Sequence, residues 1–178
     1  MIAATSHELA WVDGHAPTLA CGIGPVEAAA ATAAALARAR PGAVLHVGIA
    51  GGRGLAVGTV AIGARAVYDD LAAAVRLERS VEPAPELLAA ARRALPDAPV
   101  VEIATSGGVF RSAEAPVEAM EGFGVLRAAA LAGVPAIELR AVSNAVGEDD
   151  RSRWDIAGAL AALGDAGRRL LAELQETP

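Results

Sequence analysis

Three short segments of this chain place polar side chains and small residues at the start of a predicted helix or at the ends of predicted strands. Residues 118–122 hold a Met-Glu pair, residues 138–146 close an apolar strand on Ser143 and Asn144, and residues 47–52 close an earlier strand with glycines. Glycine lets a ligand approach the backbone closely. Because α/β proteins place ligand-contacting groups at strand ends, we predict that the three segments meet at one site.

Glu121 is the residue of these segments best suited to chemistry. Its carboxylate can accept protons from two neighbouring hydroxyl groups at once, and its charge can stabilise a positive centre that develops on a sugar. The alternative is that Glu121 only favours the start of a helix, where a negative charge complements the helix dipole. Residue type alone leaves these two interpretations equal.

The hydrophobic pattern predicts the elements that must position these side chains. Pro25 opens an alanine-rich helix over residues 25–40, and further helices are predicted at 86–95, 117–132 and 154–174. Strands are predicted at 1–4, 18–21, 43–49, 58–69 with a bend at Gly63, 100–105 and 136–142. Strands alternating with helices predict an α/β fold, a mostly parallel sheet with helices on both faces. Without a linker or repeat, we expect a single domain over residues 1–178.

Composition excludes several classes of function. A formal charge of −6 without any cluster of basic residues argues against nucleic acid as a partner. The sequence contains no lysine, which excludes a Schiff-base mechanism and a Walker-type phosphate loop. The single cysteine, Cys21, cannot form an internal disulfide. The three histidines, His7, His15 and His46, lack the spacing of a metal site, so we predict no metal.

The hydropathy pattern also bears on location. No stretch has the 18 or more uninterrupted apolar residues of a membrane span, and the N-terminus lacks a basic region followed by a cleavage site. We therefore expect no membrane association and a cytoplasmic protein. Cys21 and His46 fall in or beside apolar strands, so we interpret both as packing residues rather than as a nucleophile and its base.

Three motifs carry a resemblance to a known family: GIGPVE at 22–27, AMEGF at 119–123 and SNAVG at 143–147. They are similar to motifs of the nucleoside phosphorylase and nucleosidase superfamily, and within it they most resemble the futalosine hydrolases. The resemblance implies a three-layer phosphorylase-like fold with a mixed, mostly parallel sheet, a homo-oligomer, and a purine nucleoside substrate with no cofactor. It further implies cleavage of futalosine to hypoxanthine and dehypoxanthine futalosine in menaquinone biosynthesis.

The resemblance assigns roles on the sugar side of such a site. Glu121 matches the glutamate that binds the ribose hydroxyls, and Met120 the methionine packed against the sugar, although methionine is usually core filler. Glu8 aligns with the water-activating glutamate and is predicted as general base, but His7 competes because imidazole titrates nearest neutral pH. Arg140 is expected to face the pocket and orient the water.

On the base side, Asn144 takes the place of the aspartate of adenine-directed relatives. Its amide can address purine N7 and a neighbouring ring group but cannot be a strong acid, which suits a 6-oxopurine such as hypoxanthine. The alternative is an asparagine in a turn. Phe110 matches an aromatic residue that stacks on the base, though core packing explains it equally well. Ser143, with Ala50 and Gly51 from the earlier strand end, completes the predicted substrate-binding set.

Two departures leave alternatives open. Ile49 stands where adenine-directed relatives have a serine that helps hold the water, and Arg53 keeps phosphate binding possible where other phosphorylase arginines are missing. Hydrolysis is favoured over phosphorolysis. A purine nucleoside phosphorylase, a methylthioadenosine/adenosylhomocysteine-type nucleosidase and a non-catalytic nucleoside-binding protein are the alternatives, and Asn144 argues against the second.

Overall fold

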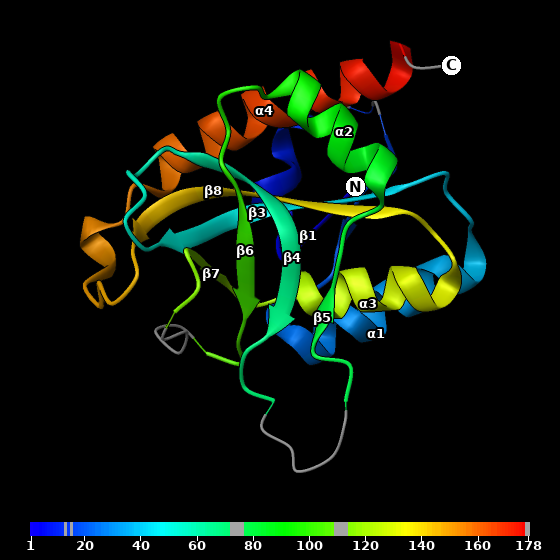
Figure 1. The fold of residues 1–178 in the computed structure, drawn as a ribbon, viewed down its shortest axis with the longest axis horizontal. Helices are drawn as coiled ribbons and strands as arrows, with labels where there is room; N and C mark the ends of the chain where they lie inside the picture. Colours follow the sequence, from blue (N-terminus) through cyan, green and yellow to red (C-terminus); the bar gives the residue numbers. More distant parts are fainter. Residues whose placement is uncertain (13, 15, 72–76, 109–113, 177–178) are drawn as a thin grey trace.

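The computed structural model describes residues 1–12, 14, 16–71, 77–108 and 114–176, and in these ranges eight strands form one mixed sheet with helices on two sides (Figure 1). The strands are β1 (Ile2–Ala3), β2 (Leu19–Ala20), β3 (Val44–Gly52), β4 (Val60–Tyr68), β5 (Ser80–Val81), β6 (Val100–Thr105), β7 (Val117–Ala119) and β8 (Ala136–Ala145). The helices are α1 (Pro25–Arg38), α2 (Pro85–Ala94), α3 (Gly122–Ala132) and α4 (Ile156–Glu176), with 3₁₀ turns η1 (His7–Val12) and η2 (Arg151–Arg153).

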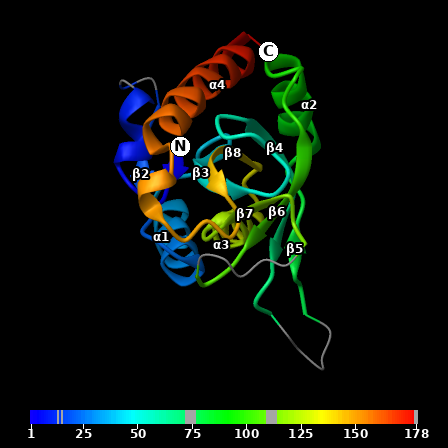
Figure 2. The same cartoon turned by 90° about the vertical axis from the view of Figure 1, so that its left-hand side faces the viewer.

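Five of the described strands pair in a closed ring. β3 pairs with β8 in parallel and with β7 antiparallel, while β4 pairs antiparallel with β8 and in parallel with β6. The parallel pair of β6 with β7 completes the ring, which Figure 2 shows with these strands gathered around a common centre. The sheet is therefore mixed with a parallel majority, as predicted, and five of its strands close into a ring.

Two helix layers cover the sheet, with α2 and α4 on one side and α1 and α3 on the other (Figure 1). Leu163 and Leu170 of α4 are buried, and they pack in one core with the buried side chains of Val47 and Leu139 from the central strands. Alanines and leucines of α1 and α3, together with Val125 of α3, form a second core on the opposite side. Within the described ranges, every helix is too short or too polar to span a bilayer.

The predicted elements differ from the observed ones chiefly between residues 117 and 132. One helix was expected there, but Val117–Ala119 is strand β7, and the helix begins only at Gly122. The prediction was wrong because a three-residue strand gains its hydrogen bonds from β3 and β6, which no local pattern reveals. β3 and β8 each run three residues further than predicted, β5 was missed, and the bend at Gly63 is confirmed as a register shift against β6.

Candidate active site

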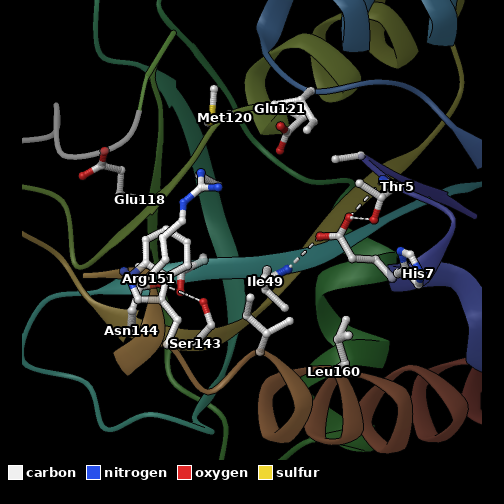
Figure 3. A pocket seen from close by; sticks show the side chains of 18 of the residues that line it. Thr5, His7, Ile49, Glu118, Met120, Glu121, Ser143, Asn144, Arg151 and Leu160 are labelled. Atoms are coloured by element: carbon white, nitrogen blue, oxygen red, sulfur yellow. Dashed lines mark hydrogen bonds between the residues drawn. The ribbon is translucent and has the colours of Figure 1, made fainter. Parts of the chain in front are cut away.

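A cavity of about 450 Å³ opens where the ends of β3 and β8 meet β7 and the start of α3 (Figure 3). Residues from η1, η2 and α4 complete its wall. It is lined by Ala4, Thr5, His7, Glu8, Ile23, Ile49, Ala50, Gly51, Glu118, Ala119, Met120, Glu121, Ser143, Asn144, Val146, Arg151, Trp154, Ile156 and Leu160. The three segments predicted to converge thus share one cavity.

The pairing register of the strands determines which residues form the floor of this cavity. Gly51 of β3 lies opposite Glu118 of β7 on one side and opposite Asn144 of β8 on the other. A methyl group on Gly51 would lie 3.4 Å from Nδ2 of Asn144 and 3.2 Å from the Val146 side chain. The missing side chain therefore leaves room above the strand for a flat ligand between two polar groups.

Glu8 is a buried carboxylate at the cavity wall, held by three donors. Its Oε2 accepts from the backbone N–H of Thr5 at 3.0 Å and from the Thr5 hydroxyl at 2.8 Å, and its Oε1 accepts from the N–H of Ile49 at 3.0 Å. Glu8 is 6% exposed, and His7, the residue before it in the chain, also lines the cavity (Figure 3). At Ile49, whose side chain is apolar, the backbone N–H fixes the carboxylate.

Arg140 does not line the cavity but lies directly beneath it, with 1% of its surface exposed. Its Nε donates to Glu138 Oε1 at 2.7 Å, one NH2 group lies 3.4 Å from Glu121 Oε2, and the other donates to the Ile49 carbonyl at 3.4 Å. Burial alone would lower the pKa of Arg140, but the charges of Glu138, Glu121 and Glu8 raise it. The guanidinium is a fixed positive charge under the site.

Two further buried groups hold Arg140 in place, and sequence analysis predicted a polar role for neither of them. Glu138 and His46 are both fully buried, and they lie opposite each other across β3 and β8. The ring atom Nε2 of His46 is 2.5 Å from the Arg140 guanidinium, and Nδ1 is 3.1 Å from the Ile2 carbonyl. Since a carbonyl only accepts, Nδ1 carries the hydrogen and Nε2 accepts from Arg140.

Burial shifts the pKa of both groups. Burial, reinforced by the charge of Arg140, lowers the pKa of His46 well below its ordinary value, so the ring is neutral. Burial likewise raises the pKa of Glu138, although Arg140 opposes that shift. Oε2 of Glu138 has no hydrogen-bond partner in the described part of the chain. The prediction that His46 serves packing alone was too narrow, because the ring also accepts a hydrogen bond from Arg140.

Glu121 connects this buried cluster to the cavity. It lies at the N-cap of α3 and is 4% exposed. Its Oε1 accepts a hydrogen bond from the backbone N–H of Gly24 at 3.1 Å, and its Oε2 faces Arg140. It makes no side-chain cap to its own helix, so a purely helix-capping role does not explain it. Met120 lies beside it on the cavity wall (Figure 3).

Asn144 and Ser143 both line the cavity and are buried at the end of β8. The Ser143 hydroxyl lies 2.8 Å from Asn144 Oδ1 and 3.3 Å from the Ala50 carbonyl, while Asn144 Nδ2 donates to the Ala145 carbonyl at 3.0 Å. These contacts fix the plane of the amide. Because an amide nitrogen carries two hydrogens, one N–H of Asn144 can still be offered to a ligand.

Most of the predicted site residues are brought together here. The cavity wall contains seven of them: Glu8, Ala50, Gly51, Met120, Glu121, Ser143 and Asn144. Arg140 is the correction: it was expected to face the pocket, but its pairing with Glu138 and His46 keeps it in the layer below. Phe110 lies outside the described residues, and Arg53, which is exposed, is not part of the wall.

Sequence reasoning missed several wall residues. Arg151 and Trp154 come from the segment between β8 and α4, and the guanidinium lies over the indole ring at 5.3 Å from its centre. Glu118 was quoted in a motif but given no role. Cys21 is buried near the site, and burial raises the pKa of its thiol to about 11, which agrees with its expected packing role. The described residues contain no group of three or more metal-binding side chains.

Comparisons with known proteins agree with this architecture. The family model of the phosphorylase superfamily matches residues 9–176, so the chain belongs to this superfamily. A futalosine hydrolase of Streptomyces coelicolor is 62% identical over 58 residues, which cover 33% of this chain and 25% of that enzyme. The chain thus aligns with only about a quarter of the length of this curated relative.

Two solved structures share the fold at low sequence identity. A 5′-methylthioadenosine/S-adenosylhomocysteine nucleosidase of Colwellia psychrerythraea, in complex with adenine, superposes with a TM-score of 0.88 at 19% identity and covers 97% of this chain and 93% of that one. A mutant futalosine hydrolase of Helicobacter pylori gives a TM-score of 0.87 at 16% identity, with 97% of each chain covered. Both have a mixed sheet flanked by helices in common with this chain.

Proposed function

We propose that this protein is an N-ribosyl hydrolase that cleaves futalosine to hypoxanthine and dehypoxanthine futalosine, a step of menaquinone biosynthesis. The observation that carries the proposal is that one cavity brings together the carboxylates of Glu8 and Glu121 and the amide of Asn144. These are a base, a diol ligand and a purine-recognising group, the set that glycosidic cleavage of a nucleoside requires. The identity with a futalosine hydrolase segment supports the choice of substrate.

Glu121 would bind the sugar. Ionised, its two oxygens can accept the 2′- and 3′-hydroxyl protons of ribose, and its negative charge stabilises the oxocarbenium-like centre as the C1′–N9 bond stretches. Arg140, 3.4 Å from Oε2, holds this carboxylate at a fixed angle from below. Met120 supplies an apolar contact to the sugar ring.

Glu8 would activate the water. Its carboxylate takes one proton as the water oxygen bonds to C1′, and the electron pair of the C1′–N9 bond leaves with the purine. Three donors, from Thr5 and Ile49, hold Glu8 before substrate arrives, so little reorganisation is needed. Asn144 donates an N–H to the departing base at N7, and solvent returns the proton that neutralises it.

The reaction is tested by incubating the protein with futalosine, inosine and methylthioadenosine, each with and without phosphate, and following free base by chromatography. We expect hypoxanthine from futalosine without phosphate. Adenine released from methylthioadenosine alone would refute the proposed substrate. No base from any of the three would leave only a binding function.

Glu8→Gln tests the assigned base. The amide keeps the shape of the side chain but cannot accept a proton, so kcat on futalosine should fall by roughly 10²–10⁴ while KM changes little. Glu86→Gln on the exposed face of α2 is the matched control and should turn over like the wild type. Wild-type turnover in Glu8→Gln would remove Glu8 from the mechanism and favour His7.

One observation favours a second candidate, a purine nucleoside phosphorylase. Arg151 is a cation on the cavity wall, and phosphorolysis needs a cation to bind phosphate. Its guanidinium already lies over Trp154, which makes it better placed for packing than for a phosphate beneath the sugar. Phosphate-dependent release of base from inosine, lost in Arg151→Ala, would establish this alternative.

We further propose that residues 1–178 act as one domain in a cytoplasmic homo-oligomer whose interface lies near the cavity mouth. Ile23 and Ile156 both line the cavity and are 63% and 43% exposed, and Val26 of α1 is 73% exposed. Exposed apolar groups gathered near a site are typical of an interface. Light scattering after size exclusion tests this, and a monomer at micromolar concentration would refute it.

A further inference from the structure

Glu138 is a buried carboxylate beneath the cavity whose presence packing does not explain. It lies in β8, is fully buried, and its Oε1 accepts a hydrogen bond from Arg140 Nε at 2.7 Å. Its Oε2 has no hydrogen-bond partner among the residues that the structure describes. A buried ion pair is often no more stabilising than apolar side chains of the same volume. Stability alone therefore gives little reason for this charge, and what Glu138 does to Arg140 gives a better one.

Glu138 and His46 together fix the direction in which the Arg140 guanidinium points. Glu138 takes the hydrogen on Nε, and the neutral ring of His46 accepts one from Nη2. Neither of these two acceptors lines the cavity. Nη1 donates to the Ile49 carbonyl at 3.4 Å, Nη2 lies 3.4 Å from Glu121 Oε2, and these two residues do line the cavity (Figure 3). The buried acceptors thus leave the remaining donors directed toward the site.

The guanidinium of Arg140 also comes close to Glu8, in the space that Gly48 leaves open. A methyl group on Gly48 of β3 would lie 3.2 Å from the guanidinium carbon and 2.8 Å from Glu8 Oε1. Only a glycine lets the cation and the carboxylate share this space. Burial alone would lower the pKa of Arg140, and the charges of Glu138, Glu121 and Glu8 outweigh that effect. One cation is therefore shared by both carboxylates of the proposed reaction.

The groups that face Arg140 come from several elements. The charged ones are Glu138 on β8, Glu121 at the start of α3 and Glu8 in η1, while His46 on β3 and the Cys21 thiol beside β2 are uncharged at neutral pH. Without Glu138, the buried cation would act on the two cavity carboxylates alone. A nearby positive charge favours the ionised form of a carboxylate, which makes that carboxylate a weaker acceptor of a proton. The negative charge of Glu138 offsets this effect.

We propose that Glu138 is a positioning residue that aims the guanidinium of Arg140 and offsets its charge, so that Glu8 remains basic enough to take a proton from water. This inference rests on the proposed function, because it assumes that Glu8 is the general base. Glu138 does not touch the substrate: it acts through Arg140, and it is ionised at neutral pH. Burial raises the pKa of Glu138, and the ion pair with Arg140 limits that rise.

Glu138→Gln tests the charge, because the amide keeps the shape of the side chain and its oxygen can still accept from Arg140 Nε. The acidic limb of the pH profile of kcat on futalosine should move about one pH unit lower. The plateau value of kcat should fall roughly 5-fold, while KM stays within about 2-fold. A merely structural role would lower Tm and leave the limb in place.

Two further variants separate charge from other effects. Glu138→Asp keeps the charge but shortens its reach, so it should lower kcat with the acidic limb near its wild-type pH. Glu102→Gln is the matched control, because Glu102 of β6 pairs with Arg65 of the neighbouring strand β4 at the surface. It should behave as the wild type.

Carbon-13 NMR of the side-chain carboxyls gives a measurement that needs no turnover. In the wild type at pH 7 the carboxyl of Glu138 should be ionised. In Glu138→Gln the carboxyl of Glu8 should keep its charge to a pH about one unit lower than in the wild type.

Each result has one meaning. A protonated Glu138 at pH 7 overturns the inference even if no variant folds. An acidic limb or a Glu8 titration that stays at its wild-type pH in folded Glu138→Gln also overturns it, and continued release of hypoxanthine from futalosine would then leave the proposed function standing. An equal shift of the limb in Glu138→Asp overturns it as well, because that variant keeps the charge. An ionised Glu138 and a shifted Glu8 titration without hydrolysis of futalosine would support the charge balance and refute the hydrolase.

Discussion

Replacing Gly122 with alanine should destabilise the protein by disturbing the buried anchor of Arg140. A methyl group there would lie 2.6 Å from the carboxyl carbon of Glu138 and closer still to both of its oxygens. Glu138 is fully buried and bound to Arg140, so its carboxylate cannot move aside into water. In an unhindered helix the same change would stabilise by about 0.5–1 kcal/mol. Overpacking costs about 1–3 kcal/mol, and so close a clash with a group that cannot move takes the upper end of that range, so we expect a net loss of about 2 kcal/mol.

For a chain of this length, such a loss lowers Tm by roughly 4–8 °C. The assay is urea unfolding of Gly122→Ala, Glu138→Ala and the double variant, followed by far-UV circular dichroism. Glu138→Ala removes the colliding carboxylate, so adding Gly122→Ala to it should be neutral or stabilising, which gives a coupling of about 2 kcal/mol or more. Equal effects of Gly122→Ala in both backgrounds would refute the steric account.

Two other predictions follow from the buried groups. The folded protein holds His46 with a pKa lowered below 6.5 while the unfolded chain takes up a proton near that value, so the free energy of unfolding should fall as pH drops below 6.5, by up to about 1.4 kcal/mol per unit. His46→Gln should flatten this slope between pH 7.5 and 5, and parallel curves for the two proteins would contradict it. Cys21, with a thiol pKa of about 11, should resist iodoacetamide at pH 8 in the native protein and react once unfolded. Rapid native-state labelling would show that the thiol is accessible.

Part of the site could be predicted because Ala50, Gly51 and Asn144 lie near the ends of strands, and the hydrophobic pattern locates those strands. Glu121 and Asn144 lie more than twenty residues apart in sequence, yet both follow apolar segments whose pairing with β3 brings them together. Glu8 was found through the family resemblance, since a glutamate in a short 3₁₀ turn has no distinctive pattern of its own.

The parts that were missed depend on long-range pairing. β7 reads as helix because its three residues continue into an alanine-rich stretch, and this hid the orientation of Glu118. The buried cluster did leave a signal: Glu138 and Arg140 stand two residues apart in an apolar strand, which places both on one face. Only the register of β3 against β8 shows that His46 lies opposite Glu138.

The hydrogen bond from Gly24 to Glu121 links the cavity to the loop that precedes α1. If ribose hydroxyls bind this carboxylate as proposed, they would compete with that backbone amide for its acceptor positions, and occupancy of the cavity would then be thermodynamically coupled to the conformation of the loop. The coupling is reciprocal: whatever holds the loop against Glu121 weakens the ligand by the same factor that the ligand weakens the loop. Hydrogen exchange at the Gly24 amide would therefore report ligand binding to Glu121 without a labelled ligand. The change in the exchange rate on binding would measure the coupling.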